Sequence, residues 1–208
     1  MTDLKSILSN LIYSAKAKTE EKIREEADEL TQKAKKALNT VTTKFTFKAL
    51  PKTLAELQEL EEAELTDPNA TVALTVLALN VYESDPEECF KMLDFLNGPN
   101  VMSPAVRDFI RDRFMDDHGY VVRSYFKGAT PENNYEPKTP YTVAVLKTRE
   151  SDDCLEDGYK TLYIQSGGAD SERPVQLRLK PSTKQWFLNA FEAILADIRI
   201  PDEKDPWA

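Results

Sequence analysis

The chain has 208 residues, of which 41% are hydrophobic and 30% are charged. This composition excludes a disordered or fibrous protein, and a folded chain of this length buries roughly 70% of its unfolded surface. A net charge of -9 at pH 7 argues against nucleic acid as a partner, because affinity for phosphate backbones comes mainly from Lys and Arg. No stretch approaches the roughly 18 to 20 apolar residues of a membrane span, so we expect a cytoplasmic protein.

The first 40 residues predict an amphipathic helix. Its apolar positions recur every three or four residues, and the second half places acidic residues before basic ones, which suits the helix dipole. This helix could bind a protein partner or mediate self-association, or it could pack against its own domain. We therefore divide the chain into an N-terminal helix, 1–40, and a single α+β domain, 41–208.

Four helices are predicted between residues 53 and 118. They cover residues 53–65, 66–82, 84–98 and 103–119, and capping residues or prolines mark their starts. The 66–82 segment is apolar nearly all round, so we expect it to be the most buried helix. Before them, residues 43–51 contain Phe45 and Phe47 in alternation, which predicts a short strand or an extended connector.

From Tyr120 the hydrophobic period changes from 3.6 to 2. Residues 120–126, 141–148, 159–166 and 174–180 predict four antiparallel strands. Residues 185–191 predict a fifth, although the apolar spacing up to Ile198 also fits a helix. Helices followed by strands predict an α+β fold, with a helical layer on an antiparallel sheet of about five strands, between about residues 120 and 190.

Familiar catalytic motifs are missing from the sequence, and no catalytic residue or cofactor is predicted. The single histidine, His118, follows Asp116 and Asp117 at a predicted helix end, where a solvated terminus is favoured over a cation site. No metal site is expected. The two cysteines, Cys89 and Cys154, lack metal-ligand spacing and predict reduced thiols.

Two loops between the predicted strands carry the candidate ligand-binding residues. The first, 126–141, is unusually long, and its prolines and asparagines predict an ordered loop without regular structure. The second, 166–175, is rich in Gly, Ser and charged residues. We expect the two loops to pack together, with Asp170 or Arg173 as the partner of the Tyr135 hydroxyl. The candidate binding residues are Glu132, Asn133, Tyr135, Asp170 and Arg173, in a ligand site or in a structural corner.

Several segments resemble a family of uncharacterised bacterial proteins, a domain of unknown function. The resemblance is carried by "FKGATPENNY", "SGGADSERPVQLRLK", "QWFL" and "IRIPDEKDPWA", with support from "MLDFLNGP", "SP" and "FIRDRF". It covers about residues 45–208. It implies no established activity, substrate or catalytic residue.

The sequence favours a cytoplasmic binding or scaffolding module whose loops or N-terminal helix contact a protein or a small polar ligand. The alternative is a hydrolase or transferase of unfamiliar type, using the carboxylates Glu132 and Asp170 with Tyr135 and Arg173. A deep pocket that joins those side chains would favour the enzyme, and a filled surface would favour the binding module.

Overall fold

A computed structural model describes residues 21–22, 24 and 39–207. Contacts along the backbone divide the chain into two units, 1–40 and 41–208. Nearly all of the predicted helix over residues 1–40 lies outside the described residues. The second unit contains the sheet, its helical layer and the candidate site.

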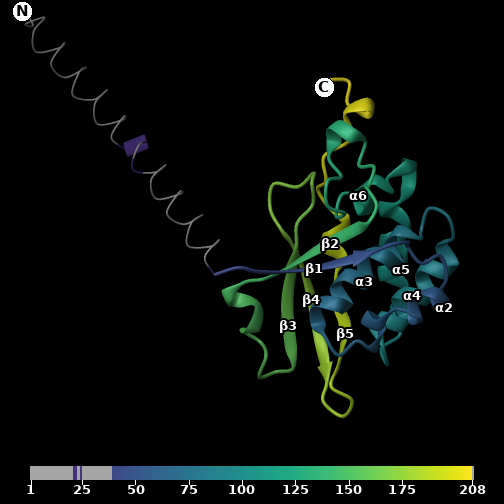
Figure 1. The fold of residues 1–208 in the computed structure, drawn as a ribbon, viewed down its shortest axis with the longest axis vertical. Helices are drawn as coiled ribbons and strands as arrows, with labels where there is room; N and C mark the ends of the chain where they lie inside the picture. The colour runs from purple at the N-terminus through teal and green to yellow at the C-terminus, as the bar shows by residue number, and fades with distance from the viewer. Residues whose placement is uncertain (1–20, 23, 25–38, 208) are drawn as a thin grey trace, which may run out of the picture. The chain divides into compact units, whose positions relative to one another are not determined.

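The sheet has five antiparallel strands in the order β1-β2-β3-β4-β5 (Figure 1). The strands are β1 Val41–Phe47, β2 Tyr141–Lys147, β3 Tyr159–Ile164, β4 Arg173–Lys180 and β5 Gln185–Ala190. Each strand pairs with the next in sequence, and β1 pairs with β2 along its whole length, from Val41 opposite Lys147 to Phe47 opposite Tyr141. The predicted antiparallel sheet of about five strands is confirmed.

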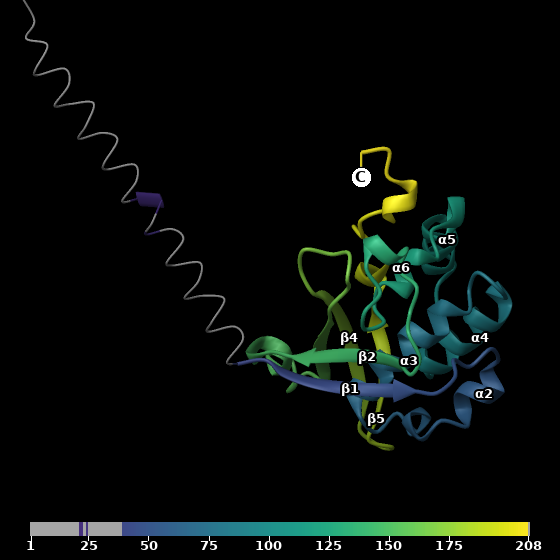
Figure 2. The ribbon, with the colours of Figure 1, turned by 45° about the horizontal axis from the view of Figure 1, so that its top comes forward.

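The helices lie on one face of this sheet (Figure 2). They are α2 Leu54–Gln58, α3 Pro68–Asn80, α4 Pro86–Asn97, α5 Pro104–Arg113 and α6 Tyr120–Arg123. The side chains of Thr53, Asp67, Asp85 and Ser103 accept hydrogen bonds from backbone N–H groups in the first turns of α2 to α5. Prolines occupy the first position of α3, α4 and α5, where the missing N–H costs no helical hydrogen bond. These local signals explain why the predicted helix starts were close to the observed ones.

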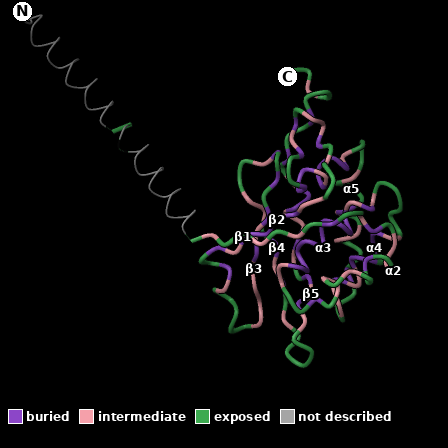
Figure 3. The backbone as a smooth tube through the Cα atoms, in the orientation of Figure 1, coloured by how far each residue is buried: buried purple, intermediate pink, exposed green. Residues whose placement is uncertain are grey.

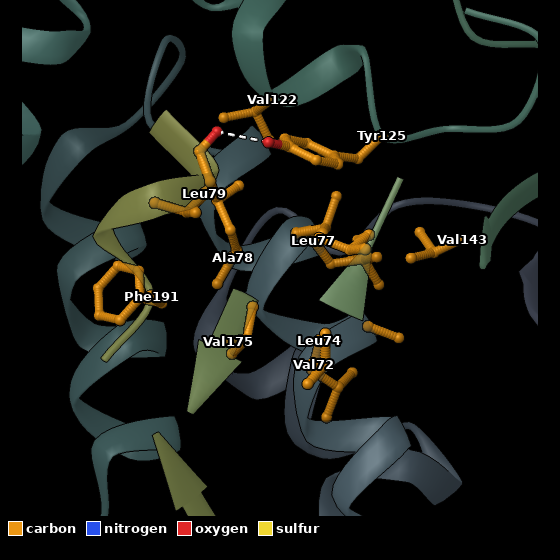
Figure 4. Close-up of a cluster of buried hydrophobic side chains, with 14 of the residues drawn as sticks. Val72, Leu74, Leu77, Ala78, Leu79, Val122, Tyr125, Val143, Val175 and Phe191 are labelled. Carbon is orange, nitrogen blue, oxygen red and sulfur yellow. Dashed lines mark hydrogen bonds between the residues drawn. The ribbon is translucent and has the colours of Figure 1, made fainter. Parts of the chain in front are cut away.

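Helix α3 lies at the centre of the core. Every residue from Ala70 to Leu79 is buried, as predicted from its apolar surface. Leu77 and Leu79 lie among side chains from the sheet and from α6, including Val175 and Val122 (Figure 4). Buried residues are concentrated between the helices and the sheet (Figure 3). The core therefore joins the two layers of the α+β fold into one hydrophobic cluster.

The predicted strand over residues 120–126 is wrong. Residues Tyr120–Arg123 form α6, and only Phe126 makes an isolated antiparallel bridge, to Val143 of β2. The segment is apolar on nearly every side chain because it is buried, and a short buried run fits helix and strand equally well. Strand β1, for which the sequence predicts a strand or a connector, pairs with β2 at the edge of the sheet.

Three other boundaries differ from the prediction. The helix predicted for 53–65 divides into α2 and a 3₁₀ turn, Glu61–Glu64. The helix predicted for 103–119 ends at Arg113, and Asp116 and Asp117 beyond it adopt positive φ angles. Residues 190–198 contain the end of β5 and a 3₁₀ turn, Glu192–Leu195, so neither a continuous strand nor an α-helix runs through them.

We expect a fragment lacking residues 1–38 to fold. The hydrophobic core of the described residues extends from Phe47 to Ile198, so the shortened chain keeps every member of it. Thermal unfolding monitored by circular dichroism should remain cooperative, and light scattering should show whether self-association has changed. An insoluble or molten fragment would show that the deleted residues complete the core.

Candidate functional site

The 128–140 loop is held in place by its own side chains. At its start, a 3₁₀ turn, Pro131–Asn133, is capped by Thr130. The Asn133 side chain accepts a hydrogen bond from the Thr130 backbone N–H at 2.9 Å and donates one to the Gly128 carbonyl at 2.8 Å. Asn134 and Tyr135 then adopt left-handed conformations. The loop is ordered without long regular structure, as its asparagines and prolines predicted.

Tyr135 fixes the loop to the core. Its side chain is fully buried, and its hydroxyl donates to the Arg199 carbonyl at 2.8 Å. Its ring stacks on Tyr120, with 5.7 Å between the centroids. Burial raises the pKa of Tyr135 to about 12, so the phenol is neutral at physiological pH. The hydroxyl has a partner, as predicted, but that partner is a backbone carbonyl and neither Asp170 nor Arg173.

The 165–172 loop, which joins β3 to β4, packs against the same region. The Gly167 N–H donates to the Ser124 carbonyl at 2.8 Å, and the hydroxyls of Ser124 and Ser166 lie 2.7 Å apart. Gly168 approaches Tyr135 so closely that a Cβ atom at Gly168 would lie 1.9 Å from the phenol oxygen. The predicted contact between the two loops is confirmed.

The other predicted binding residues are dispersed over this corner. Arg173 donates to the carbonyls of Ala196 and Asp197, at 3.2 and 2.9 Å, so its guanidinium holds the C-terminal segment. Glu132 and Asp170 are exposed. A hydrogen bond from the Thr130 side chain holds the pKa of Glu132 below its usual value. The side chains of Asn133 and Tyr135 hold the loop itself, and none of the five predicted residues lines the pocket described next.

A pocket of about 420 Å³ lies beside this corner. We call it the charged pocket. It is formed by the segment after α5, by α6, by the end of the 128–140 loop and by the C-terminal segment around residue 203. Its lining residues are Asp117, Tyr120, Arg123, Asn134, Glu136, Pro201, Glu203 and Lys204. Asn134 and Glu136 flank the buried Tyr135, so the anchoring of that ring also positions two residues of the pocket wall.

Lys204 is the best-placed cation in the charged pocket. Its ammonium nitrogen lies 2.5 Å from a carboxylate oxygen of Asp117 and 3.2 Å from the Asp117 carbonyl. It also lies 5.9 Å from the centroid of the Tyr120 ring, within the range of a cation–π contact. The hydrogen bond from Lys204 lowers the pKa of Asp117. The Lys204 ammonium group, whose side chain is 45% exposed, thus contacts a carboxylate, a carbonyl and an aromatic face.

The remaining charges leave the charged pocket with an excess of acid. Arg123 is paired with Glu83, and the Asn134 amide donates to the Glu203 carboxylate at 2.8 Å. Glu136 is exposed and forms no ion pair with any described residue. Three carboxylates and two cations line the pocket, and both cations are already paired.

Most residues of the charged pocket could not be predicted from the sequence. The sequence indicates Asp117 only as a neighbour of His118 at a helix end. It predicts a strand for Arg123, whereas Arg123 is the last residue of α6. Glu203 and Lys204 lie in the segment "IRIPDEKDPWA", which had carried the family resemblance.

Metal clusters, membrane-spanning helices and disulfides are all absent from the described residues. Across residues 21–22, 24 and 39–207, no group of three or more His, Cys, Asp or Glu side chains could hold a metal ion. Within the same ranges, every helix is too short or too polar to cross a bilayer. Cys89 is buried, Cys154 is exposed, and neither forms a disulfide.

A comparison with protein-family models assigns the chain to a family. The model of a domain of unknown function, DUF6935, matches residues 49–202. The chain belongs to this family. No curated protein and no solved structure gives a significant match. The expected resemblance to a domain of unknown function is confirmed.

The DUF6935 match contains most of the charged pocket. It extends from α2, across α6 and both loops, to Pro201 in the pocket wall, and it ends before Glu203 and Lys204. The pocket is therefore built mainly by the DUF6935 domain, while its bound ammonium group comes from the residues that follow the match.

Proposed function

We propose that the protein is a binding module whose charged pocket recognises a ligand or a protein side chain that carries an ammonium group. The observation that supports this proposal is the set of contacts that the Lys204 ammonium group makes. Its ammonium group is bound by Asp117 and lies over Tyr120, so the pocket accepts this chemical group from the chain itself. An external ammonium group would bind there in place of Lys204, or beside it at Glu136.

The electrostatics of the whole chain support the same ligand. A net charge of -9 attracts cations and raises their concentration near the surface. Within the pocket, Glu136 is a carboxylate without an ion-pair partner among the described residues, and a ligand cation would supply one. The same charge disfavours nucleic acid.

The alternative, a hydrolase or transferase that uses loop carboxylates, is less well supported. Glu132 has a lowered pKa, which makes it a poor proton donor at neutral pH. The Tyr135 hydroxyl is committed to the Arg199 carbonyl, and Arg173 is committed to backbone carbonyls. These groups stabilise the corner and are not arranged around a reacting atom.

We also propose that the protein is cytoplasmic. Its two cysteines form no disulfide, and reduced cysteines are usual in the cytoplasm. The proposal also includes partner binding or self-association through residues 1–40, on the basis of their amphipathic sequence pattern. The chain would then have two binding regions, the charged pocket for an ammonium group and residues 1–40 for a protein partner or a second copy of the chain.

The test is a titration of the full chain with n-butylammonium, which mimics a lysine side chain, followed by NMR. We expect shifts at the backbone amides of Tyr120, Asn134 and Glu136, and little response to 1-butanol, which has the same length without the charge. Glu136→Gln should weaken binding. Lys204→Met removes the ammonium group that pairs with Asp117. It should strengthen n-butylammonium binding by about tenfold, equivalent to about 1.4 kcal/mol.

The matched controls are Glu61→Gln in the 3₁₀ turn before α3 and Lys44→Met on β1. Both positions are exposed and lie outside the charged pocket. They should leave the affinity for n-butylammonium unchanged. Equal binding of 1-butanol and n-butylammonium, or weaker binding by Lys204→Met, would rule out the proposed site.

A further inference from the structure

A second pocket, of about 310 Å³, is lined by cations and by no carboxylate. We call it the basic pocket. Arg178 and Lys180 of β4 contribute its charges, and Phe187 of β5 contributes an aromatic ring. Pro99, after α4, and Pro181, after β4, add apolar walls. Its volume lies near the lower end of the range for small-ligand sites, roughly 300–1,000 Å³.

The register of the sheet brings the polar and aromatic groups together. Arg178 lies opposite Tyr159 on β3 and opposite Phe187 on β5, so the three side chains form a row across three strands. The Arg178 guanidinium lies over the Tyr159 ring, 5.4 Å from its centroid. Lys180 is two residues further along β4, and residues at this spacing point to the same face of a sheet.

The two cations lack acidic partners. Elsewhere in the chain, Arg107, Arg123, Lys147 and Lys160 are all paired with carboxylates. Arg178 and Lys180 are exposed, and within residues 39–207 no carboxylate lies within ion-pair distance of either. On a protein with nine more acidic than basic charges, such a pair creates a local site for an anion.

Gly98 fixes the ring of Phe187. This glycine ends α4 with a φ of +67°, a conformation that side chains disfavour. A Cβ atom there would lie 2.3 Å from the Phe187 ring, so the ring packs directly on the backbone at Gly98. Phe187 is nevertheless only partly buried, and its exposed part belongs to the pocket. The result is a fixed aromatic surface beside two unpaired cations.

We propose that the basic pocket binds a small aromatic carboxylate. The carboxylate accepts hydrogen bonds from Arg178, whose planar guanidinium matches its two oxygens, and Lys180 adds a second positive charge. The flat ring of the ligand packs against Phe187 and the neighbouring prolines. This site shares no residue with the charged pocket, so it goes beyond the proposed recognition of ammonium groups.

The sequence segments that resemble the family also meet here. Gly98 and Pro99 end "MLDFLNGP", Arg178 and Lys180 end "SGGADSERPVQLRLK", and Phe187 is the aromatic residue of "QWFL" that faces the pocket. These three segments lie on α4, β4 and β5.

The test is a titration of the full chain with benzoate, followed by NMR at the backbone amides of Gly98, Arg178 and Phe187. Benzamide is the matched ligand, because it has the same shape without the charge. Cyclohexanecarboxylate keeps the charge without the flat ring. We expect benzoate to bind at least tenfold more tightly than benzamide and more tightly than cyclohexanecarboxylate.

Arg178→Gln should weaken benzoate binding at least tenfold, and Phe187→Leu should remove the preference for benzoate over cyclohexanecarboxylate. Lys44→Gln, an exposed cation on β1, is the control for loss of charge and should leave the affinity unchanged. Thermal unfolding of each variant confirms that it is folded. Equal affinity for benzoate and benzamide, unchanged binding by folded Arg178→Gln, or shifts confined to other regions would overturn the proposal. Binding of inorganic phosphate in preference to benzoate would overturn it as well, because the site would then select an anion without a ring.

Discussion

Replacing Leu79 with alanine should lower the free energy of unfolding by about 2–5 kcal/mol. Leu79 is completely buried in α3, between the sheet and the other helices. Truncation removes buried apolar surface and leaves a cavity that neighbours on both layers cannot fill completely. The measurement is urea denaturation of the full chain, with the midpoint and slope compared between wild type and variant.

The matched control is Leu155→Ala, which removes the same atoms from a side chain that is 40% exposed. Its effect should stay within about 0.5 kcal/mol, as for most surface substitutions. Similar losses in the two variants would contradict the central position of α3, because the difference between them depends on burial alone.

A methyl group at position 168 should also destabilise the protein, by about 1–3 kcal/mol, through overpacking. The Cβ atom of Gly168→Ala would lie 1.9 Å from the Tyr135 oxygen and 2.8 Å from the ring carbon that carries it. Tyr135 cannot easily move aside, because its ring is buried and its hydroxyl is bound to Arg199. The two loops must therefore separate or shift. Asp170→Ala, an exposed change two residues further on, should have little effect.

Combining Gly168→Ala with Tyr135→Phe shows whether that clash is the cause. Tyr135→Phe alone should cost about 0.5–1.5 kcal/mol, because it removes one hydrogen bond. It also removes the oxygen atom nearest to the added methyl group, so the double variant should be more stable than the sum of the single effects predicts. We expect a coupling energy of about 0.5–3 kcal/mol. Additive effects would mean that the loops relax apart without contact between these two groups.

Local chemistry explains which parts of the fold were predictable. The starts of α3, α4 and α5 follow from a capping side chain and a proline, and both act within one turn of the chain. The ordered 128–140 loop follows in the same way from the side chain of Asn133. The burial of α3 follows from an apolar surface with no polar side to expose.

Features that depend on distant parts of the chain could not be predicted in this way. Residues 120–126 have side chains suited to a strand, but residues Tyr120–Arg123 form α6 and only Phe126 pairs with β2, at Val143. The partner of the Tyr135 hydroxyl is a backbone carbonyl 64 residues away. Every residue has a backbone carbonyl, so the sequence does not indicate which one is the partner. The charged pocket needs Asp117 and Lys204 to meet across 87 residues, and composition does not reveal such a pair.

The position of β1 affects how the family domain should be isolated. The DUF6935 match begins at residue 49, whereas the first strand of the sheet ends at Phe47. A fragment cut at the family boundary would therefore expose the backbone N–H and carbonyl groups of β2 that β1 pairs with. Unpaired strand edges of this kind join one another and promote aggregation. Insolubility of such a fragment would reflect the missing seven-residue strand, and expression should start before Val41.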